Sequence, residues 1–407
     1  LLDGKTGREI SLASTMNPQH QFGADVIARS NYVLENGGEE MQAVVRKALN
    51  QLIGQACASA GVKREEILQV SIVGNTCMHH LFMGISPKSL VLAPYVPAVK
   101  DGMILSAEEC GLKIAEEGKV LLFPNIAGFV GGDTVGCMLS VAFDQLEPMT
   151  LMIDIGTNGE LVMGNRNKMV TTSTAAGPAF EGAKIECGMR GARGAISHVD
   201  VKDGKLCLEV IENVKPVGIC GSGLIDGIAF MIRNGILDSY GSLCDPEDLT
   251  GEFEKSLAWR LKEKDGKPVF VLVPGEETAS GEDIYISQKD IREVQLAKGA
   301  IAAGIRIMAE KLSIRPEDIQ QVYLAGAFGN YMDAANACEI GLIPYALKDR
   351  ITPIGNAAGE GAKLGVVNRG QYEYACRMAK EAEFIELATE NEFQDTFVDE
   401  LEFARAV

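Results

Sequence analysis

The chain has 407 residues, of which 46% are hydrophobic and 23% are charged, so it can bury a core large enough for two or three domains. Its formal net charge of −18 argues against nucleic acid and anionic membranes as partners. No apolar run approaches the length of a membrane span, and the polar, turn-like residues after Leu1 do not resemble a signal peptide. We therefore expect a cytoplasmic protein.

The ten cysteines include no C-x-x-C pair and no closely spaced cluster. Single cysteines within apolar stretches are typical of reduced, mostly buried thiols. We expect no iron–sulfur cluster or zinc site that is assembled from this chain alone.

Residues 1–18 resemble residues 161–178 in their pattern of strand, glycine turn, strand and proline, with the turns expected at Gly4 and Gly164. A second pair of segments agrees with this repeat. An amphipathic helix expected at 44–60 precedes a strand that ends at Gly74, and a helix at 295–312 precedes a strand that ends at Gly326. The sequence therefore predicts an internal duplication.

Adjacent histidines, His79 and His80, follow the first of these strands on a helix expected to begin near Thr76. Neighbouring residues diverge on a helix, so the pair is not a chelate. Two roles stay open for the histidines. They are structural, or they face a partner beside the proline-rich loop at 93–97.

A glycine-rich loop at 125–131 runs into a helix of small residues that carries Asp133 in its first turn. An aspartate there fits a helix N-cap. The functional alternative is that Asp133 orients an attacking water molecule.

The stretch 150–163 is an apolar strand that ends on Asp154, a turn that contains Gly156 and Gly159, and a second apolar strand. Glycines let backbone N–H groups approach a phosphate chain closely, and an aspartate at the strand end can hold the waters of a bound Mg²⁺. The same pattern also fits an ordinary hairpin turn that Asp154 and Asn158 cap.

The segment 191–290 has no counterpart in the first half, so we expect an inserted subdomain there. Its pattern predicts a hairpin at 195–211 and a tight helix start at Cys220. A polar stretch follows at 245–282, and its carboxylate-rich face predicts a solvated surface.

The last glycine turn follows an apolar strand at 322–325 and precedes a helix. Such strand-to-helix junctions bind nucleotides in α/β folds, and Gly326 and Gly329 could let an adenosine lie flat against the backbone. Close packing of the helix on the strand explains the same glycines equally well.

Together these elements predict an α/β protein of two lobes, residues 1–147 and 148–407, with a ligand cleft between them. If the repeat holds, roughly ten residues that form a first phosphate hairpin should precede Leu1, so we expect an N-terminally truncated first lobe.

The order of these motifs resembles the superfamily of sugar kinases, actin and heat-shock chaperone ATPases. This resemblance implies that the two lobes are ribonuclease H-like and surround a nucleotide cleft. More narrowly, 22–29, 74–80, 93–97, 154–160, 221–226 and 295–300 resemble the ATPase domain of the reductive activators of corrinoid proteins. The resemblance spans the whole chain. It implies that ATP helps return a Co(II) corrinoid to Co(I), with the electron supplied by a [2Fe–2S] ferredoxin-like domain that this chain does not contain.

The resemblance also implies roles for individual residues. Catalysis would fall to Asp133, which positions water, and to Asp154, which holds Mg²⁺ through water. ATP would be held by Gly156, Thr157, Asn158, Gly159, Glu160, Gly177, Gly326, Ala327, Phe328, Gly329 and Asn330.

The implied partners are ATP, the corrinoid protein of a methyltransferase system, and a second copy in a homodimer. The first lobe, around His79 and His80, is our candidate docking surface for the corrinoid protein. Two alternatives stay open, a small-molecule kinase of the same superfamily and a nucleotide-independent docking module. The missing hairpin leaves ATP hydrolysis by this chain open as well.

Overall fold

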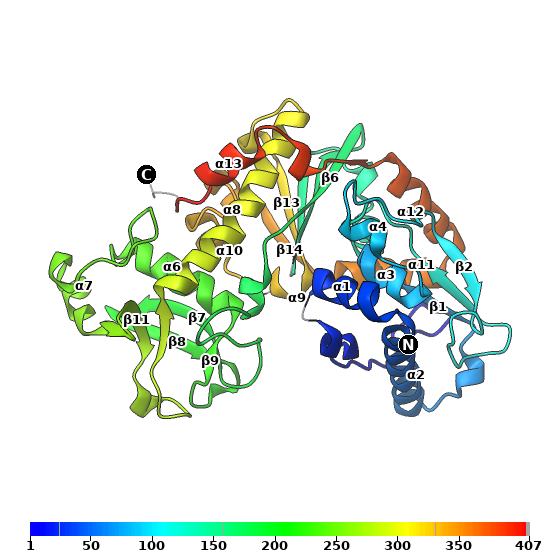
Figure 1. The fold of residues 1–407 in the computed structure, drawn as a ribbon, viewed down its shortest axis with the longest axis horizontal. Coiled ribbons are helices and arrows are strands. Elements are labelled where there is room, and N and C mark those ends of the chain that lie inside the picture. The colour runs from blue at the N-terminus through cyan, green and yellow to red at the C-terminus, as the bar shows by residue number, and fades with distance from the viewer. Residues whose placement is uncertain (24, 157, 330, 404–407) are drawn as a thin grey trace. The chain divides into compact units, whose positions relative to one another are not determined.

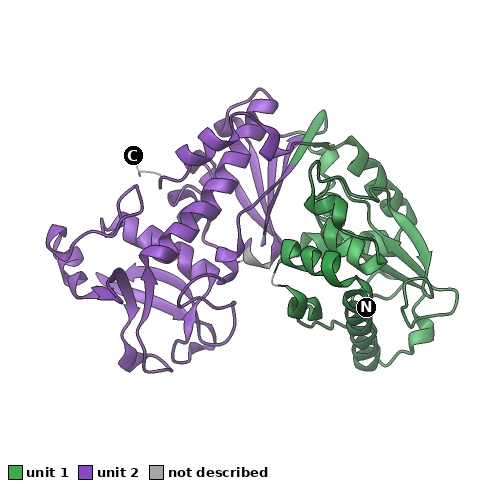
Figure 2. Cartoon of the chain, in the orientation of Figure 1, with its two compact units in different colours: residues 1–147, 165–171, 356–384 green, residues 148–164, 172–355, 385–407 purple. Residues whose placement is uncertain are grey.

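The computed structural model of this α/β protein describes residues 1–23, 25–156, 158–329 and 331–403 (Figure 1). The chain forms two compact units (Figure 2). Unit 1 comprises Leu1–Glu147, Asn165–Thr171 and Asn356–Phe384, and unit 2 comprises Pro148–Gly164, Thr172–Gly355 and Ile385–Val407. One boundary between the units coincides with the expected boundary at residue 147, while the segment 356–384 packs with unit 1.

Unit 1 is built around a three-stranded sheet of order β1-β3-β2, in which β1 and β3 are parallel and β2 is antiparallel. Its strands are β1 (Gln69–Ile72), β2 (Met103–Ser106) and β3 (Lys119–Leu122), and its helices are α1 (Val26–Asn36), α2 (Glu39–Ala60), α3 (Thr76–Met83), α4 (Lys88–Val91), α5 (Gly132–Ser140), α11 (Ala357–Val367) and α12 (Arg369–Glu381). Val120 and Leu122 of β3 are fully buried in a core that α2 and Phe82 complete.

Helices α5 and α11 pack against each other through glycines. A Cβ at Gly361 would lie 2.0 Å from the carbonyl oxygen of Gly136, and a Cβ at Gly136 would lie 2.8 Å from that of Ala358. Since neither distance can accommodate a side chain, the two backbones approach each other directly. Asn356 caps α11 by accepting a hydrogen bond from the Gly359 N–H group.

Unit 2 contains most of a six-stranded sheet of order β14-β13-β4-β5-β6-β15. The strands are β4 (Thr150–Ile155), β5 (Gly159–Asn165), β6 (Lys168–Thr174), β13 (Gln321–Ala325), β14 (Ile351–Gly355) and β15 (Glu383–Phe384). Parallel pairing joins β4 to β13 and β13 to β14, and antiparallel pairing joins β4 to β5. The other helices here are α8 (Gln288–Lys311), α9 (Gly326–Gly329), α10 (Ala334–Glu339) and α13 (Phe393–Asp399).

The inserted segment carries two small sheets, of order β8-β7-β9 and β10-β11-β12. Their strands are β7 (Ala195–Lys202), β8 (Lys205–Val210), β9 (Gly218–Ile219), β10 (Leu261–Lys264), β11 (Lys267–Val273) and β12 (Ile284–Ser287), accompanied by α6 (Gly221–Arg233) and α7 (Glu252–Ser256). The expected hairpin at 195–211 and the helix start after Cys220 are confirmed. The carboxylates of the stretch 245–282 are largely exposed, as expected of a solvated face, whereas five consecutive apolar residues of β11 from Val269 onward are buried.

The duplication is confirmed in the order of the elements. In unit 1, α2 is followed by a 3-10 turn at Arg64–Glu66, by β1 and by α3. In unit 2, α8 is followed by a 3-10 turn at Pro316–Asp318, by β13 and by α9. Each of the two strands then pairs in parallel with a later strand, β3 or β14.

The two hairpins of the repeat differ from expectation. The first copy contains only an isolated β-bridge between Leu2 and Glu9 where two strands were predicted. In the second copy, β5 and β6 form, but Arg166 and Asn167 make the turn and Gly164 lies within β5. All ten cysteines are free thiols, six of them buried, as predicted. Within the described residues, no helix combines the length and the apolarity that crossing a membrane requires.

Candidate functional site

Three parallel strands of unit 2 end side by side. In the register of the sheet, Asp154 of β4 lies opposite Ala325 of β13, and Ala325 lies opposite Gly355 of β14. The residues at or just beyond these ends are therefore Asp154, Gly326 and Gly355. In α/β proteins, ligands bind at the carboxyl ends of parallel strands, where following helices also begin.

Gly326 lets the Asp154 carboxylate approach the backbone closely. Its φ of +85° is a left-handed conformation that glycine adopts without strain, and a Cβ there would lie 2.8 Å from Asp154 Oδ1. Any other residue at 326 would occupy the space beside the half-buried carboxylate of Asp154. Glycine at 326 is therefore required by the close approach of this carboxylate as well as by the backbone conformation.

The turn after Asp154 contains two glycines with different surroundings. A Cβ at Gly156 would make ordinary contacts, with Asn158 O at 3.8 Å and Glu181 Oε1 at 3.9 Å. A Cβ at Gly159 would lie 2.7 Å from Thr174 Oγ1. The position of Gly156 therefore accommodates a methyl group, whereas Gly159 is a glycine because the turn packs closely on the strand beside it.

The turn is also held by its own hydrogen bonds. The Gly156 N–H group donates to the Asn158 carbonyl at 2.9 Å, and β4 and β5 pair from Ile155 and Gly159 outward. Glu160 lies opposite Asp154 in this register, and the Ser173 hydroxyl donates to its carboxylate at 3.4 Å. The predicted hairpin is confirmed. Thr157 lies outside the described residues.

Gly177 and Glu181 belong to the segment after β6. Gly177 has a φ of +77° and precedes a 3-10 helix at Pro178–Glu181, and no atom lies within 4 Å of a Cβ built on it. Gly177 was predicted from the sequence, whereas Glu181 was not. Glu181 follows the repeated segment 161–178 by three residues, but a glutamate in a loop carries no sign of what it faces.

The predicted adenosine segment begins directly after β13. Gly329 ends α9, and a Cβ there would lie 2.9 Å from the Leu324 Cβ, so helix–strand packing accounts for this glycine. Of the side chains of Ala327 and Phe328 nothing is described, and Asn330 lies outside the described residues. Adenosine binding by 326–330 stays a prediction.

Asp133 lies in the first turn of α5 in unit 1, but it is not the N-cap. Gly131 occupies the N-cap position, and Asp133 Oδ1 accepts a hydrogen bond from the next N–H group, that of Thr134, at 2.8 Å. The N-cap interpretation is therefore wrong. Asp133 and Asp154 belong to different units, and the proposed role of Asp133 in orienting water stays a prediction.

His79 and His80 are buried, with 7% and 0% of their surface exposed. His80 Nδ1 lies 2.7 Å from the Thr76 carbonyl, to which it donates, and His80 Nε2 accepts from the Ala98 N–H group at 3.0 Å. These two bonds require the neutral imidazole. Burial lowers the pKa of both rings, that of His79 to about 4.

The hypothesis that these histidines face a partner is consequently wrong, because buried rings present no surface for docking. Their role is structural. His79 Nδ1 lies 3.2 Å from the side-chain amide nitrogen of Asn125, which links α3 to the glycine-rich loop after β3.

A buried carboxylate, Asp226, joins three elements of unit 2. It accepts hydrogen bonds from His198 Nδ1 of β7 at 2.9 Å and from the side-chain amide of Asn336 of α10 at 2.6 Å. Further along α6, Arg233 donates hydrogen bonds to Asn336 and Glu339. Burial raises the pKa of Asp226, and these donors oppose the rise. The motif 221–226 is therefore explained by the packing of α6.

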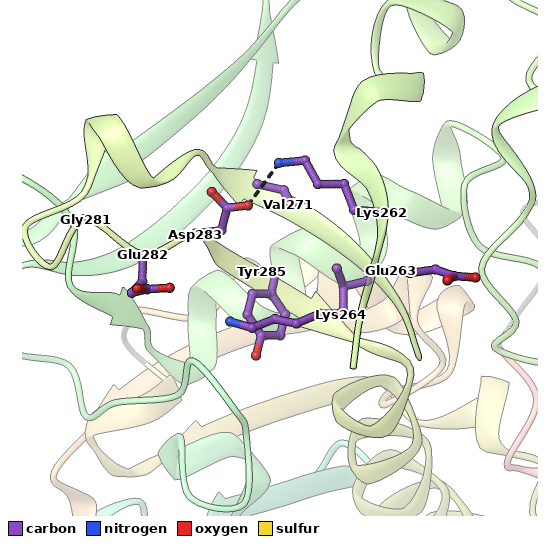
Figure 3. A pocket seen from close by; sticks show the side chains of 9 residues that line it. Lys262, Glu263, Lys264, Val271, Gly281, Glu282, Asp283 and Tyr285 are labelled. Carbon is purple, nitrogen blue, oxygen red and sulfur yellow. Dashed lines mark hydrogen bonds and ion pairs between the residues drawn. The ribbon is translucent and has the colours of Figure 1, made fainter. Parts of the chain in front are cut away.

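Two cavities lie outside the strand-end site. One of about 300 Å³ lies on the sheet of β10, β11 and β12, where the Lys262 ammonium pairs with Asp283 at 3.0 Å and Lys264 lies over the Tyr285 ring (Figure 3). The other, of about 250 Å³, lies in unit 1 beside Asn125. Neither cavity is lined by a residue that the sequence analysis assigned to ATP.

Comparison with known proteins identifies the chain. Residues 148–406 match the family model described as the C-terminal domain of RACo, the ASKHA domain, and residues 1–146 match the RACo middle region. The chain is 37% identical over 401 residues to the "Corrinoid activation enzyme RamQ" of Eubacterium limosum, covering 98% of this chain and 67% of that protein. It is 28% identical over 422 residues to the "[Co(II) methylated amine-specific corrinoid protein] reductase" of Methanosarcina barkeri, covering 99% and 74%.

A solved structure agrees with these relatives. The "Reductive activator for corrinoid,iron-sulfur protein" superposes with a TM-score of 0.87 at 35% sequence identity, over 100% of this chain and 64% of that chain. The present chain thus spans less than two thirds of the length of that protein. The chain belongs to the RACo family, with a RACo middle region followed by a RACo C-terminal ASKHA domain.

Proposed function

We propose that this chain is the ATP-binding and corrinoid-protein-docking part of a reductive activator, which uses ATP to help return a Co(II) corrinoid to the methyl-accepting Co(I) state. The observation that carries the proposal is that the two RACo family models together cover residues 1–146 and 148–406. Relatives that match over nearly the whole chain are named for the activation or reduction of corrinoid proteins, which supports the same function.

Each unit is, in this proposal, a ribonuclease H-like lobe of the kind found in sugar kinases, actin and heat-shock chaperone ATPases. The support is the repeated order of helix, 3-10 turn, strand, glycine and helix, with the strand paired in parallel to a later strand in both copies. In a chain with two such copies, one metal-binding carboxylate is enough. Unit 2 is the better candidate to supply it, because Asp154 lies at the end of strand β4.

The residues at the strand ends fit a bound Mg²⁺ and the phosphates of ATP. The Asp154 carboxylate lies close to Gly326, and the Glu181 carboxylate lies beside Gly156 in the turn that follows Asp154. Asp154 would hold water molecules of the ion, the segments 156–160 and 177 would surround the phosphates, and 326–330 would hold the adenosine. When bound, Mg²⁺ supplies the positive charge that the phosphates need.

The corrinoid protein is the proposed protein partner, and its cobalt is the group to be reduced. Nucleotide and partner affect each other only if the chain has different affinities for the partner with and without ATP, and this coupling acts equally in both directions. The electron would come from the [2Fe–2S] cluster of a ferredoxin-like domain. In this proposal, the described part of the chain binds the nucleotide and the corrinoid protein, orients them and releases them.

The test of the nucleotide site is Asp154→Asn, with Asp203→Asn as control. Asp203 lies in the exposed turn between β7 and β8 with a φ of 52°, which asparagine tolerates. In calorimetric titration, Asp154→Asn should weaken Mg-ATP binding by roughly 10- to 100-fold, because a metal-orienting carboxylate is lost. The control should bind as the wild type does.

Unchanged Mg-ATP affinity in Asp154→Asn would remove Asp154 from the site. Rapid phosphoryl transfer from ATP to a sugar or acetate would favour the small-molecule kinase. If the wild-type chain bound a corrinoid protein but no nucleotide, the docking module would be the better description.

A further inference from the structure

Among the described residues that are not neighbours of Gly156 in the chain, Glu181 contributes the one side chain within 4 Å of a Cβ built on Gly156. Its Oε1 atom lies 3.9 Å from the position of a Gly156 Cβ, while Asn158 O lies 3.8 Å from that position. The Glu181 carboxylate therefore lies beside the backbone of the turn at Gly156. Glu181 is half-buried at the end of its 3-10 helix.

The backbone around Glu181 is tightly determined. Gly182 has a φ of +78°, and its N–H group donates to the Ala179 carbonyl. A Cβ at Gly182 would lie 2.3 Å from the Met189 carbonyl oxygen, so the chain after Glu181 packs directly on the next loop. Glu181 consequently has a defined place opposite the turn, instead of the range of positions that a surface glutamate adopts.

We infer that Glu181 is a second carboxylate of the nucleotide site, which positions hydrated Mg²⁺ across the turn from Gly156. The inference rests on the proposed nucleotide function. Mg²⁺ in nucleotide sites typically keeps several waters and is bound by one or two carboxylates in addition to the phosphates. Asp154 supplies one such carboxylate, and Glu181 supplies another from a different segment.

The negative charge of Glu181 should affect the binding of metal-free ATP and of Mg-ATP in opposite directions. A carboxylate beside the phosphates repels metal-free ATP, because like charges at short range destabilise each other. The same carboxylate favours binding once Mg²⁺ lies between the two anions. Removing the charge should therefore change the binding of ATP and of Mg-ATP in opposite directions, which a merely structural side chain would not do.

The experiment measures the affinity for ATP by calorimetric titration, in EDTA and in excess Mg²⁺, for the wild-type chain and for Glu181→Gln. The factor by which Mg²⁺ tightens ATP binding should fall roughly tenfold in Glu181→Gln. ATP in EDTA should bind the variant at least as tightly as the wild type. Thermal unfolding without ligand should be unchanged, because glutamine keeps the size and the hydrogen-bonding oxygen.

Glu186→Gln is the matched control. It changes the same residue type five positions further along the segment, where the carboxylate accepts a hydrogen bond from the Tyr285 hydroxyl at 2.9 Å. Its Mg²⁺ factor should equal that of the wild type.

An unchanged Mg²⁺ factor in Glu181→Gln would overturn the inference. So would equal weakening in EDTA and in Mg²⁺, which would indicate a structural role. Absence of ATP binding in the wild-type chain would be a different result, because it would refute the nucleotide site as a whole and Glu181 with it.

Discussion

Gly156 and Gly159 belong to one turn, yet their replacement should have opposite consequences. Gly156→Ala should leave the free energy of unfolding nearly unchanged, since its Cβ would meet ordinary contacts at 3.8 and 3.9 Å and its φ is not left-handed. The methyl group would, however, lie between the turn and the Glu181 carboxylate and weaken Mg-ATP binding. Gly159→Ala should destabilise unit 2 by about 1–3 kcal/mol, because its Cβ would lie 2.7 Å from Thr174 Oγ1 and 3.0 Å from Ile301 Cγ1.

Urea unfolding and calorimetric titration of both variants test this pair of expectations. If Gly156→Ala bound Mg-ATP with wild-type affinity, the face of the turn at Gly156 would not be where the phosphates lie. If Gly159→Ala were as stable as the wild type, the packing argument for that glycine would be wrong.

The buried histidines predict a pH dependence of unit 1. Burial lowers the pKa of His79 from its ordinary value of 6.5 to about 4 in the folded state, so the unfolded chain binds more protons between these pH values. Stability is therefore fully present above pH 6.5 and is lost as the pH falls towards 4, by roughly 3 kcal/mol in total for His79. His80, whose pKa is also lowered by burial, adds to the loss.

Urea unfolding at pH 7.5 and at pH 5 measures this loss. His79→Gln should reduce the difference between the two pH values, although it also removes the acceptor that faces Asn125. His20→Gln should leave the difference unchanged, since His20 is exposed. A wild-type chain equally stable at both pH values would contradict the burial of neutral histidines.

Helices α5 and α11 pack against each other in unit 1, and glycines at their contact allow the close approach. In Gly361→Ala the Cβ would lie 2.0 Å from the Gly136 carbonyl oxygen, so α5 and α11 would have to separate. Alanine is favoured over glycine within a helix by up to about 1 kcal/mol, but overpacking of this kind costs about 1–3 kcal/mol. We expect the clash to win and the free energy of unfolding to fall.

Gly4→Ala is the control for this expectation, because a Cβ at Gly4 meets no atom within 4 Å. Denaturant unfolding of both variants gives the comparison. A Gly361→Ala variant more stable than the wild type would show that helix propensity outweighs the packing of the two helices.

The molecule is assembled from segments that are distant in the sequence. The segment 356–384 completes unit 1, although it follows the whole of the insertion. The end of the described chain returns to α8, where Gln295 donates to the Leu401 carbonyl at 3.1 Å and the buried Lys298 donates to that of Glu402. Burial lowers the pKa of Lys298 to about 8. The motif 295–300 is thus explained by the attachment of the chain end.

Sequence patterns alone predicted the local elements well. The hairpin of β4 and β5, the helix after Cys220 and the repeated order of helix, strand and glycine are confirmed, because each depends on neighbouring residues and on hydrophobic periodicity. Family membership was also predictable, since the motifs occur in order along the whole chain.

Only the tertiary structure determined which residues are buried and which residues from distant segments lie close together. It separated Gly156, where a Cβ would make ordinary contacts, from Gly159, which packs on a neighbouring strand, although both are glycines of one turn. It buried His79 and His80, and it placed the unremarked Glu181 opposite Gly156. The physical reason is that exposure and proximity depend on atoms contributed by distant segments, about which the pattern of one segment holds no information.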